Sequence, residues 1–276
     1  MKIVAKKKYG QNFLKDEVIV REIIEAMPKN ENIIAEIGPG LGDLTKYLVN
    51  VKSVKAFEVD TDLCKILQTK FKKEINTSTF TLQCGDVLDS WKSSLLDVKY
   101  DLVANLPYYI ATNIILKALA DPNCENLLVM VQLEVAQKFA ANSGDKIFGS
   151  LSVIAQSVGD VSIAVHAPSI AFDPPPKVDS AVLLIKKQRS RCDDEFEKML
   201  RIAFTQPRKT LQKNLSSSYE KEEVTLALKE LHVEPSIRPH QLDTRNYHQL
   251  YKILIKGTRD GRNTSDETTT DTTTGR

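Results

Sequence analysis

Short apolar runs alternate with amphipathic segments from residue 16 to about residue 140. The apolar runs have the length and composition of buried strands, and they lie at 32–37, 54–60, 80–84, 100–104 and 127–131. Between them, apolar residues recur at every third or fourth position, as on the buried face of a helix. The first helix is expected to begin after Asp16, a favourable N-cap, and to end before Pro28. Strands that alternate with helices in this way predict a parallel, doubly wound sheet.

The pattern changes after residue 160, where two apolar runs follow one another without a helix between them. These runs, at 161–165 and 181–185, predict an antiparallel pair that closes one edge of the sheet. The segment that joins them contains Phe172 and three successive prolines at 174–176. Three prolines in a row cannot form a helix or a central strand, so we expect a stiff, extended loop.

From about residue 193 the apolar residues follow helical periods only, and one helix is expected to begin at Pro207. Beyond residue 256 no large apolar residue occurs, so this tail cannot bury enough surface to become ordered. The fold class that follows is α/β, a mostly parallel sheet with an antiparallel edge, together with a small all-α domain. We expect a basic arm at 1–15, the α/β domain at 16–190, the helical domain at 191–256 and a disordered tail at 257–276.

The net charge does not indicate a binding partner, but the distribution of the basic residues along the chain does. The chain has 276 residues, of which 42% are hydrophobic, and its net charge is only +2. The basic residues nevertheless gather in three places, which are Lys2 with Lys6, Lys7 and Lys8, then 186–191, then Arg201 with Arg208, Lys209 and Lys213. Three basic clusters around one candidate site favour a polyanion as the partner.

Metal sites, disulfides and membrane spans are disfavoured. The four cysteines contain no C-x-x-C pair, and the four histidines show no metal-ligand spacing. We therefore expect reduced thiols, no metal and a cytoplasmic location. No apolar run approaches the roughly 18 residues of a membrane span, and the basic N-terminal segment lacks the apolar stretch of a signal peptide.

Three of the expected strands end in residues that suit an adenosine. The first strand ends at Gly38-Pro39-Gly40-Leu41-Gly42, a turn in which glycines let a ligand approach the backbone. Glu58 ends the second strand and can accept hydrogen bonds from both hydroxyls of a ribose, and Asp86, after the third, can accept one from an adenine amino group. The spacing G-x-G-x-G disfavours the dinucleotide fingerprint G-x-G-x-x-G, and no triphosphate-binding loop occurs.

The fourth strand ends at Asn105-Leu106-Pro107-Tyr108, which suits a target adenine. The exocyclic nitrogen of adenine is a poor nucleophile because its lone pair is delocalised into the ring. Two acceptors aimed at its N–H bonds, the Asn105 side-chain oxygen and a backbone carbonyl near Pro107, would favour a pyramidal, more nucleophilic nitrogen. Tyr108 could stack on the base, and Phe172 could close its other face. The alternatives are a strand-ending turn with a core tyrosine, and a core role for Phe172.

Taken together and in order, these motifs resemble those of a known family. Over about residues 6 to 255 the chain resembles the ribosomal RNA adenine dimethyltransferases, specifically the bacterial small-subunit type, through Gln11 to Leu14, Glu36 to Gly42, Glu58, Gly85-Asp86, Asn105 to Tyr108, and Phe172 to Val178. The resemblance implies a Rossmann-like domain with S-adenosylmethionine as methyl donor. It implies two methyl transfers to each of two adjacent adenines near the 3′ end of small-subunit rRNA, late in assembly. The partners it implies are this rRNA and the immature small ribosomal subunit, bound by a monomer.

The family pattern also assigns roles to individual residues. The donor would be contacted by Asn12, Leu14, Gly38, Gly40, Glu58, Asp86 and Asn105. The target site would be formed by Asn105, Leu106, Pro107, Tyr108 and Phe172. RNA contacts are expected from Lys6, Lys7, Lys8, Arg208, Lys209 and Lys213. Pro207 stands where the family usually has an arginine, so one expected docking charge is missing, and the threonine-rich tail lies outside the family pattern.

Three other functions are open at this point. One is a large-subunit rRNA adenine dimethylase of the macrolide-resistance type, which the glycine turn and the triple proline disfavour. Another is an rRNA-binding assembly factor whose methylation is dispensable. The third is an NAD-binding oxidoreductase, which the glycine spacing disfavours.

Overall fold

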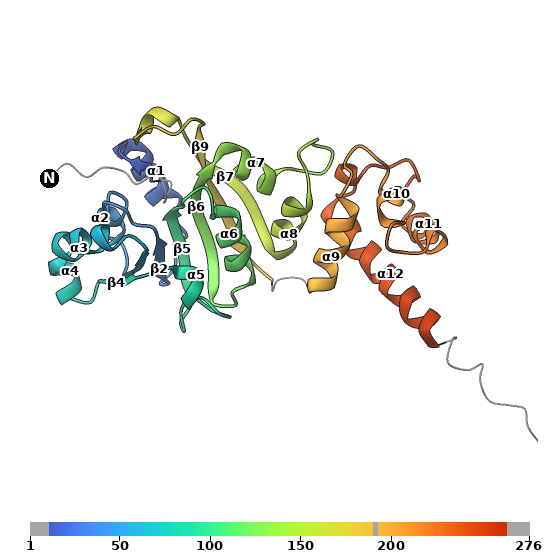
Figure 1. Cartoon of the computed structure of the whole chain (residues 1–276), viewed down its shortest axis with the longest axis horizontal. Helices are drawn as coiled ribbons and strands as arrows, with labels where there is room; N and C mark the ends of the chain where they lie inside the picture. Colours follow the sequence, from blue (N-terminus) through green and yellow to red (C-terminus); the bar gives the residue numbers. More distant parts are fainter. Residues whose placement is uncertain (1–10, 190–192, 264–276) are drawn as a thin grey trace, which may run out of the picture. The chain divides into compact units, whose positions relative to one another are not determined.

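The computed structural model describes residues 11–189 and 193–263, which fall into two units (Figure 1). The first unit contains the described residues up to Ala140 and those from Val158 to 189. The second contains 141–157 and 193–263. The segment 141–157 therefore groups with the helical unit, although the sequence placed it in the α/β domain.

A seven-stranded sheet forms the centre of the first unit, in the order β4-β3-β2-β5-β6-β9-β7. Its strands are β2 (Ile33–Ile37), β3 (Val54–Glu58), β4 (Phe80–Cys84), β5 (Tyr100–Asn105), β6 (Cys124–Gln132), β7 (Gly159–Ala167) and β9 (Ser180–Lys187). The pairs from β4 to β6 are parallel, whereas β9 runs antiparallel to both β6 and β7. The predicted parallel sheet with an antiparallel edge is confirmed.

The direction in which the strands are added reverses between β2 and β5. From β2 the chain proceeds outward to β3 and β4, then returns to β5 on the other side of β2 and proceeds to β6. Right-handed crossovers then place the helices of the two halves on opposite faces of the sheet (Figure 1). Such a reversal leaves a crevice at the carboxyl ends of β2 and β5, the usual position of a ligand in this class of fold.

Helices and a two-stranded sheet complete the first unit. Its helices are α1 (Glu17–Ala26), α2 (Thr45–Leu48), α3 (Thr61–Lys70), α4 (Lys72–Asn76), α5 (Val87–Ser90), α6 (Ala111–Ala120) and α7 (Leu133–Ala140), with a 3-10 turn η2 at Ser169–Ala171. Asp16 caps α1 as expected, because its side chain accepts from the backbone N–H groups of Val18 and Ile19. The small sheet pairs β1 (Phe13–Leu14) with β8 (Phe172–Asp173), which joins the N-terminal segment to the proline loop.

The second unit is helical, as predicted, but its elements differ in detail. It contains α8 (Ser150–Val158), α9 (Asp194–Ala203), α10 (Leu211–Leu215), α11 (Lys221–Glu230), a 3-10 turn η3 (Pro239–Gln241) and α12 (Thr244–Asn263). Pro207 does not begin a helix, because α10 begins after Thr210, whose hydroxyl accepts from Lys213 N. The tail was expected to lack structure from 257, but α12 continues to Asn263. Residues 264–276 lie outside the described part of the chain.

One disulfide corrects the expectation of reduced thiols. Cys64 on α3 is bonded to Cys84 at the end of β4, twenty positions along the chain. Cysteines that far apart show no sequence motif, so only the packing of α3 against β4 reveals the pair. Cys124 is free and buried.

Asp121 anchors the start of β5, the strand whose other end carries Asn105. It is 1% exposed, and its carboxylate accepts from the Trp91 indole N–H, the Tyr100 hydroxyl, the Leu95 and Asn123 backbone N–H groups and the Ser94 hydroxyl. Burial by itself would raise the pKa of Asp121, but these hydrogen bonds outweigh burial and hold its pKa below the ordinary value.

We predict that Asp121→Ala lowers the free energy of unfolding by about 3 kcal/mol, because it leaves several buried donors without an acceptor. The lowered pKa means that the wild-type carboxylate stabilises the fold above about pH 4, and that this contribution is lost as the pH falls further. Urea unfolding at pH 7 and at pH 3 measures both effects. The control is Asp89→Ala, an exposed aspartate in the first turn of α5, for which a loss as large as that of Asp121→Ala would contradict the prediction.

Candidate functional site

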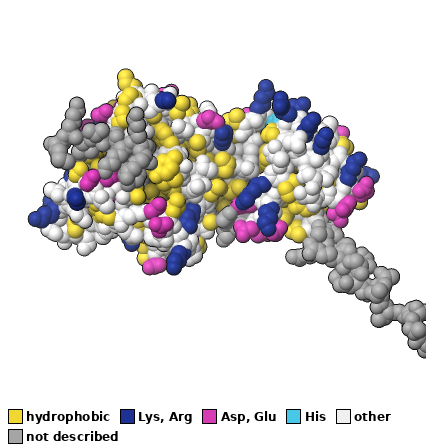
Figure 2. Space-filling model, in the orientation of Figure 1, with side chains coloured by type: hydrophobic (Ala, Val, Ile, Leu, Met, Phe, Trp, Pro, Cys, Tyr) yellow, Lys and Arg dark blue, Asp and Glu magenta, His cyan; other side chains and the backbone are white. Residues whose placement is uncertain are grey.

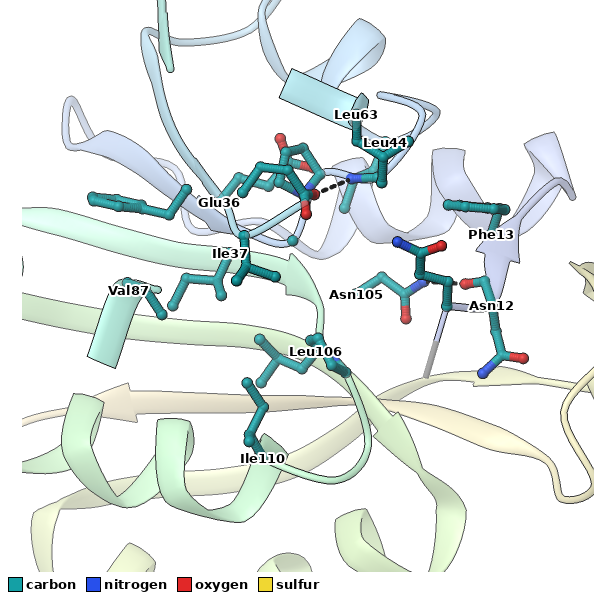
Figure 3. A pocket seen from close by; sticks show the side chains of 18 of the residues that line it. Asn12, Phe13, Glu36, Ile37, Leu44, Leu63, Val87, Asn105, Leu106 and Ile110 are labelled. Atoms are coloured by element: carbon teal, nitrogen blue, oxygen red, sulfur yellow. Dashed lines mark hydrogen bonds between the residues drawn. The ribbon is translucent and has the colours of Figure 1, made fainter. Parts of the chain in front are cut away.

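A pocket opens at the carboxyl ends of β2, β3 and β5, where the strand order reverses. The empty space in and in front of it amounts to about 960 Å³, of which a part is open solvent. Residues from four separate stretches of the chain line it, at 11–14, 36–44, 57–63 and 85–110. Figure 3 shows Glu36, Asn12 and Asn105 directed toward this cavity from three different segments.

The glycine turn after β2 forms one wall, and its backbone conformation requires glycine. Gly38 has φ +70° and Gly40 has φ +61°, both in the left-handed region that side chains disfavour. A Cβ on Gly40 would lie 3.1 Å from the Phe13 ring, and one on Gly38 would lie 3.6 Å from Pro107. The turn therefore touches both the N-terminal segment and the Asn105 motif, which brings three of the predicted motifs together.

Glu58 ends β3 inside the pocket, as predicted. It is 4% exposed, and its two oxygens accept from the backbone N–H groups of Gly40, at 3.1 Å, and Asp60, at 2.9 Å. Burial raises the pKa of Glu58, while these backbone donors partly counteract the rise. The two hydrogen bonds hold the carboxylate at a fixed position beside the glycine turn.

Glu36, in contrast, is a pocket residue to which the sequence pattern assigned no role. It lies on β2, is 1% exposed, and accepts from the Thr45 hydroxyl at 2.7 Å. Burial raises its pKa to about 8, Thr45 acts against this rise, and the charge of Glu58 adds to it. A glutamate in the otherwise apolar run 33–37 was the sequence signal, because a buried charge needs a reason to be there.

Asp86 also lines the pocket, but it has a structural role of its own. Its Oδ1 accepts from Leu88 N at 2.9 Å and so caps α5. The residue is exposed, unlike Glu36 and Glu58. Strand order nevertheless places it next to Glu58, at the end of β4.

Asn105 is held in one orientation by the N-terminal segment. Its side-chain nitrogen donates to the Asn12 main-chain oxygen at 3.0 Å, and Asn12 also lines the pocket. Because the amide nitrogen makes this bond, the Asn105 side-chain oxygen is left as an acceptor on the other side. The sequence predicted an acceptor here but not the donor bond that orients it.

The rest of the motif is split between core and pocket. Leu106 is 1% exposed, and Pro107 and Tyr108 are half-buried pocket residues. The Tyr108 hydroxyl is 2.6 Å from the Ser180 hydroxyl at the start of β9, and burial raises the Tyr108 pKa. Tyr109 is 61% exposed beside it.

Phe172 is not placed as expected. It is 4% exposed, belongs to the hydrophobic core, and is not among the residues that line the pocket. It lies across from Leu14 in the β1–β8 pair, and both residues belong to the same hydrophobic cluster. In this conformation Phe172 offers no open face to a base, and the core alternative describes it better.

The predicted RNA-contacting residues lie in the helical unit or outside the described residues. Arg208, Lys209 and Lys213 are exposed around the start of α10. Figure 2 shows Lys and Arg side chains along the upper edge of this unit. Lys6, Lys7 and Lys8 belong to the part of the chain that is not described.

The described residues contain neither a cluster of metal ligands nor a membrane-spanning helix. No group of three or more His, Cys, Asp or Glu side chains there is arranged to hold a metal ion. Within the same residues no helix has the length and apolar character needed to cross a membrane.

Known proteins resemble this chain over nearly its whole length. A model of the family described as ribosomal RNA adenine dimethylase matches residues 3–256. A Sulfurimonas denitrificans protein named ribosomal RNA small subunit methyltransferase A is 66% identical, covering 94% of this chain and 98% of that protein. An Aliarcobacter butzleri protein of the same name is 50% identical, covering 93% and 98%.

Solved structures of related methyltransferases match this chain as well. A Plasmodium falciparum dimethyladenosine transferase matches with a TM-score of 0.77 and 25% identity, covering 90% of this chain and 98% of that one. The 23S rRNA methyltransferase ErmE matches with a TM-score of 0.68 and 25% identity, covering 88% and 100%. Since the family model spans residues 3–256 and the 66%-identical relative covers 94% of the sequence, the chain belongs to the ribosomal RNA adenine dimethylase family.

Proposed function

We propose that this S-adenosylmethionine-dependent rRNA methyltransferase transfers two methyl groups to the exocyclic amino group of each of two adjacent adenines near the 3′ end of small-subunit rRNA. The observation that carries the proposal is the Asn105 amide, whose nitrogen is bonded to Asn12 and whose oxygen is left to accept at the pocket. The name of the 66%-identical relative supports the small-subunit substrate.

The polar side chains of the pocket follow one another in the same order as the polar groups of the donor. Asp86, Glu58 and Asn105 end β4, β3 and β5, so they stand in a row along one edge of the sheet. In this row Asp86 holds the adenine amino group, Glu58 the ribose hydroxyls, and Gly38 and Gly40 let the donor lie against the backbone. Asn12 and Leu14 cover it from the N-terminal segment. The bound donor supplies an electrophilic methyl group on a cationic sulfur.

The target adenine is activated by acceptors rather than by a base. The Asn105 oxygen accepts one N–H of the amino group, and a backbone carbonyl of Leu106 or Pro107 accepts the other. These bonds leave the nitrogen lone pair directed at the methyl group. Tyr108 stacks on the base, a contact worth about 1–3 kcal/mol. Phe172 would have to leave the core to close the other face.

The helical unit contributes to docking on the RNA. Arg208, Lys209 and Lys213 are exposed near the start of α10, where long cationic side chains can reach phosphates. The basic residues Lys6, Lys7 and Lys8 add to the same attraction. The enzyme acts as a monomer in the cytoplasm, on the immature small subunit late in assembly.

One experiment tests the proposal as a whole. Small subunits that lack the modification are incubated with the chain and methyl-labelled donor, and the modified bases are mapped. Dimethylation of two adjacent adenines near the 3′ end is expected. Label in large-subunit rRNA alone would refute the substrate.

The large-subunit alternative has one observation in its favour, the structural likeness to ErmE. Expression of the chain in macrolide-sensitive cells separates the two substrates, because only large-subunit dimethylation would give resistance. The Glu58→Ala variant tests the alternative in which the protein is an assembly factor whose methylation is dispensable. If that variant binds subunits normally but no longer methylates them, binding and catalysis are distinct activities.

We predict that Asn105→Ala reduces transfer by at least a hundredfold and has little effect on unfolding. Asn105→Asp is the sharper variant, because it keeps an acceptor but replaces the N–H donor that bonds the Asn12 oxygen. Two facing acceptors repel, so Asn105→Asp should also lose most activity. Single-turnover transfer with saturating donor measures both. Near wild-type transfer in Asn105→Asp would show that the Asn12 bond does not orient the side chain.

Gly40→Ala should weaken donor binding at least tenfold. Its φ of +61° costs a residue with a side chain about 1–2 kcal/mol, and the new Cβ would press on the Phe13 ring. Gly149→Ala is the control, because a Cβ there meets nothing closer than 3.8 Å. Calorimetric titration with the donor measures the affinities. Equal affinities in the two variants would contradict the role of the turn.

Subunit binding should weaken as salt is added, because phosphate contacts release counterions. In the double variant Arg208→Ala, Lys209→Ala, the slope of log affinity against log salt should fall by about one for each phosphate that is no longer neutralised. Lys229→Ala, an exposed lysine on α11, is the control and should leave the slope unchanged. Filter binding at several salt concentrations gives the slopes, and identical slopes in all proteins would exclude Arg208 and Lys209 from docking.

A further inference from the structure

The Cys64–Cys84 disulfide lies beside the part of the pocket that the proposed function gives to the adenine of the donor. Cys64 follows Leu63, which lines the pocket from α3 (Figure 3). Cys84 ends β4 directly before Gly85 and Asp86, which also line the pocket. We call Leu63, Gly85 and Asp86 the adenine end. The disulfide joins the two elements that form this end, so a change in the bond acts on its immediate neighbours in the chain.

The strand that leads to Asp86 is restrained by the sheet on one side only. Among the described strands β4 is the outermost of its sheet, so β3 is its one hydrogen-bonded neighbour there. Cys84 lies across from Glu58, and Gly85 N donates to the Glu58 main-chain oxygen at 2.8 Å. Just beyond this bond, Gly85 has φ +133°, and a Cβ placed on it would meet no atom within 4 Å. The cross-link to α3 therefore restrains a segment that has open space around its backbone.

The thiol state of Cys64 has a hydrogen-bond acceptor that the disulfide cannot use. Cys64 Sγ lies 3.6 Å from the Glu58 main-chain oxygen, a distance suited to a sulfur donor. A thiol can donate its proton to that oxygen, whereas a disulfide sulfur has no proton to donate. Reduction therefore replaces a covalent bond between α3 and β4 by a weak bond between α3 and β3. Glu58 keeps its place in both states through the Gly40 and Asp60 backbone N–H groups, so the states differ in what restrains Asp86.

Solvent reaches one sulfur of the pair much more easily than the other. Cys84 is exposed, whereas Cys64 is 4% exposed. A peroxide or a dissolved thiol therefore meets Cys84 first, and Cys64 lies behind it as the second thiol. Cys124 is buried, and burial raises the pKa of its thiol to about 12, so this thiol stays protonated and unreactive. Disulfides that form in the cytoplasm, where the enzyme is proposed to act, are usually transient.

We propose that Cys64 and Cys84 are a reversible redox site, and that their disulfide strengthens donor binding and slows release of the spent donor. The inference rests on the proposed donor site, in which Asp86 holds the adenine. A cross-linked adenine end is already in its binding conformation, so less conformational freedom is lost when the donor binds. The spent donor contains the same adenine and is held more tightly as well. Each target base needs two transfers, so oxidation slows an exchange of donor that every cycle requires.

The oxidant is a hydroperoxide. The Cys84 thiolate attacks one of its oxygens, the O–O bond breaks, and an alcohol or water leaves with a proton from solvent. The Cys64 sulfur then attacks the sulfenic acid on Cys84, and water leaves with the Cys64 proton as the S–S bond forms. The two thiols lose two electrons, which reduce the hydroperoxide. A dithiol reductant reverses the change: one of its thiolates attacks the exposed Cys84 sulfur and expels Cys64, and its second thiol then releases Cys84 as the reductant becomes a disulfide.

The test compares the full chain in its two redox states. One sample is reduced with dithiothreitol and the other is oxidised with hydrogen peroxide, the reagents are removed, and alkylation with mass spectrometry verifies each state. Calorimetric titration should show about threefold tighter binding of both S-adenosylmethionine and S-adenosylhomocysteine to the oxidised chain. Equal affinities in the two verified states would overturn the proposal, and so would failure of peroxide to join Cys64 to Cys84.

Kinetic measurements separate slower exchange from oxidative damage to the site. Dissociation of labelled S-adenosylhomocysteine, chased with unlabelled ligand, should be about threefold slower from the oxidised chain, and dithiothreitol should restore the faster rate. Single-turnover transfer with saturating donor should be the same in both states, and its loss on oxidation would contradict the proposal. Redox-dependent affinity without label in small-subunit rRNA refutes only the proposed substrate. Methylation with redox-independent affinity refutes only the redox site.

Cysteine variants make the test specific. Cys84→Ser fixes the pair in its uncrosslinked state at an exposed position, so it should bind the donor as the reduced wild type does, before and after peroxide. The controls are Cys124→Ala, at a buried free thiol, and Cys192→Ser, outside the described residues, and both should keep the response to peroxide. A response retained in Cys84→Ser, or lost in folded Cys124→Ala, would refute the assignment. The comparison of the two wild-type states requires no variant, so it decides the matter even if a variant does not fold.

Discussion

The hydrogen bond from the Asn105 amide nitrogen to the Asn12 main-chain oxygen is the contact on which the pocket depends. It joins the end of β5 to a segment more than ninety positions earlier in the chain, and it decides which atom of the amide faces the pocket. The β1–β8 pair holds the same segment from the other side. The Phe13 ring, next to Asn12, lies so close to Gly40 that a Cβ there would be only 3.1 Å from the ring and would crowd it. The N-terminal segment, the glycine turn and the Asn105 motif thus constrain one another.

The two units carry charged side chains of opposite sign at the surfaces where ligands are expected to bind. The pocket of the first unit is lined by two buried acids, Glu36 and Glu58, whose pKa values are both raised by burial. Such a site favours a cationic small molecule and disfavours a phosphate. The second unit presents exposed Arg208, Lys209 and Lys213, which favour phosphates. A donor that is positively charged and a substrate that is a polyanion need opposite surfaces, and the chain provides one in each unit.

Most of the fold follows from hydrophobic periodicity, since strands with period two and helices with period near 3.6 leave different traces in the sequence. The antiparallel edge was also predictable, because β7 and β9 follow one another without a helix between them. The position of segment 141–157 was not, since an apolar helix can pack on either unit and only the contacts decide. The end of α12 was misjudged for a related reason, because composition indicates whether a segment can be buried and not where a helix that has begun comes to an end.

The site, like the fold, has features that the sequence predicts and features that only packing decides. By itself the sequence determined the residue types at the strand ends, and the rule that parallel strands end at one edge predicted that Glu58, Asp86 and Asn105 would meet there. Tertiary structure alone decided the rest. An aromatic residue at position 172 suits both contact with a base and packing in the core, and only the tertiary structure shows that Phe172 lies in the core. Glu36 is one acid in an apolar run, and only the order β3-β2-β5 places it between Glu58 and Asn105. A sequence records which groups are available, whereas direction and distance arise only when segments far apart in the chain are brought into contact.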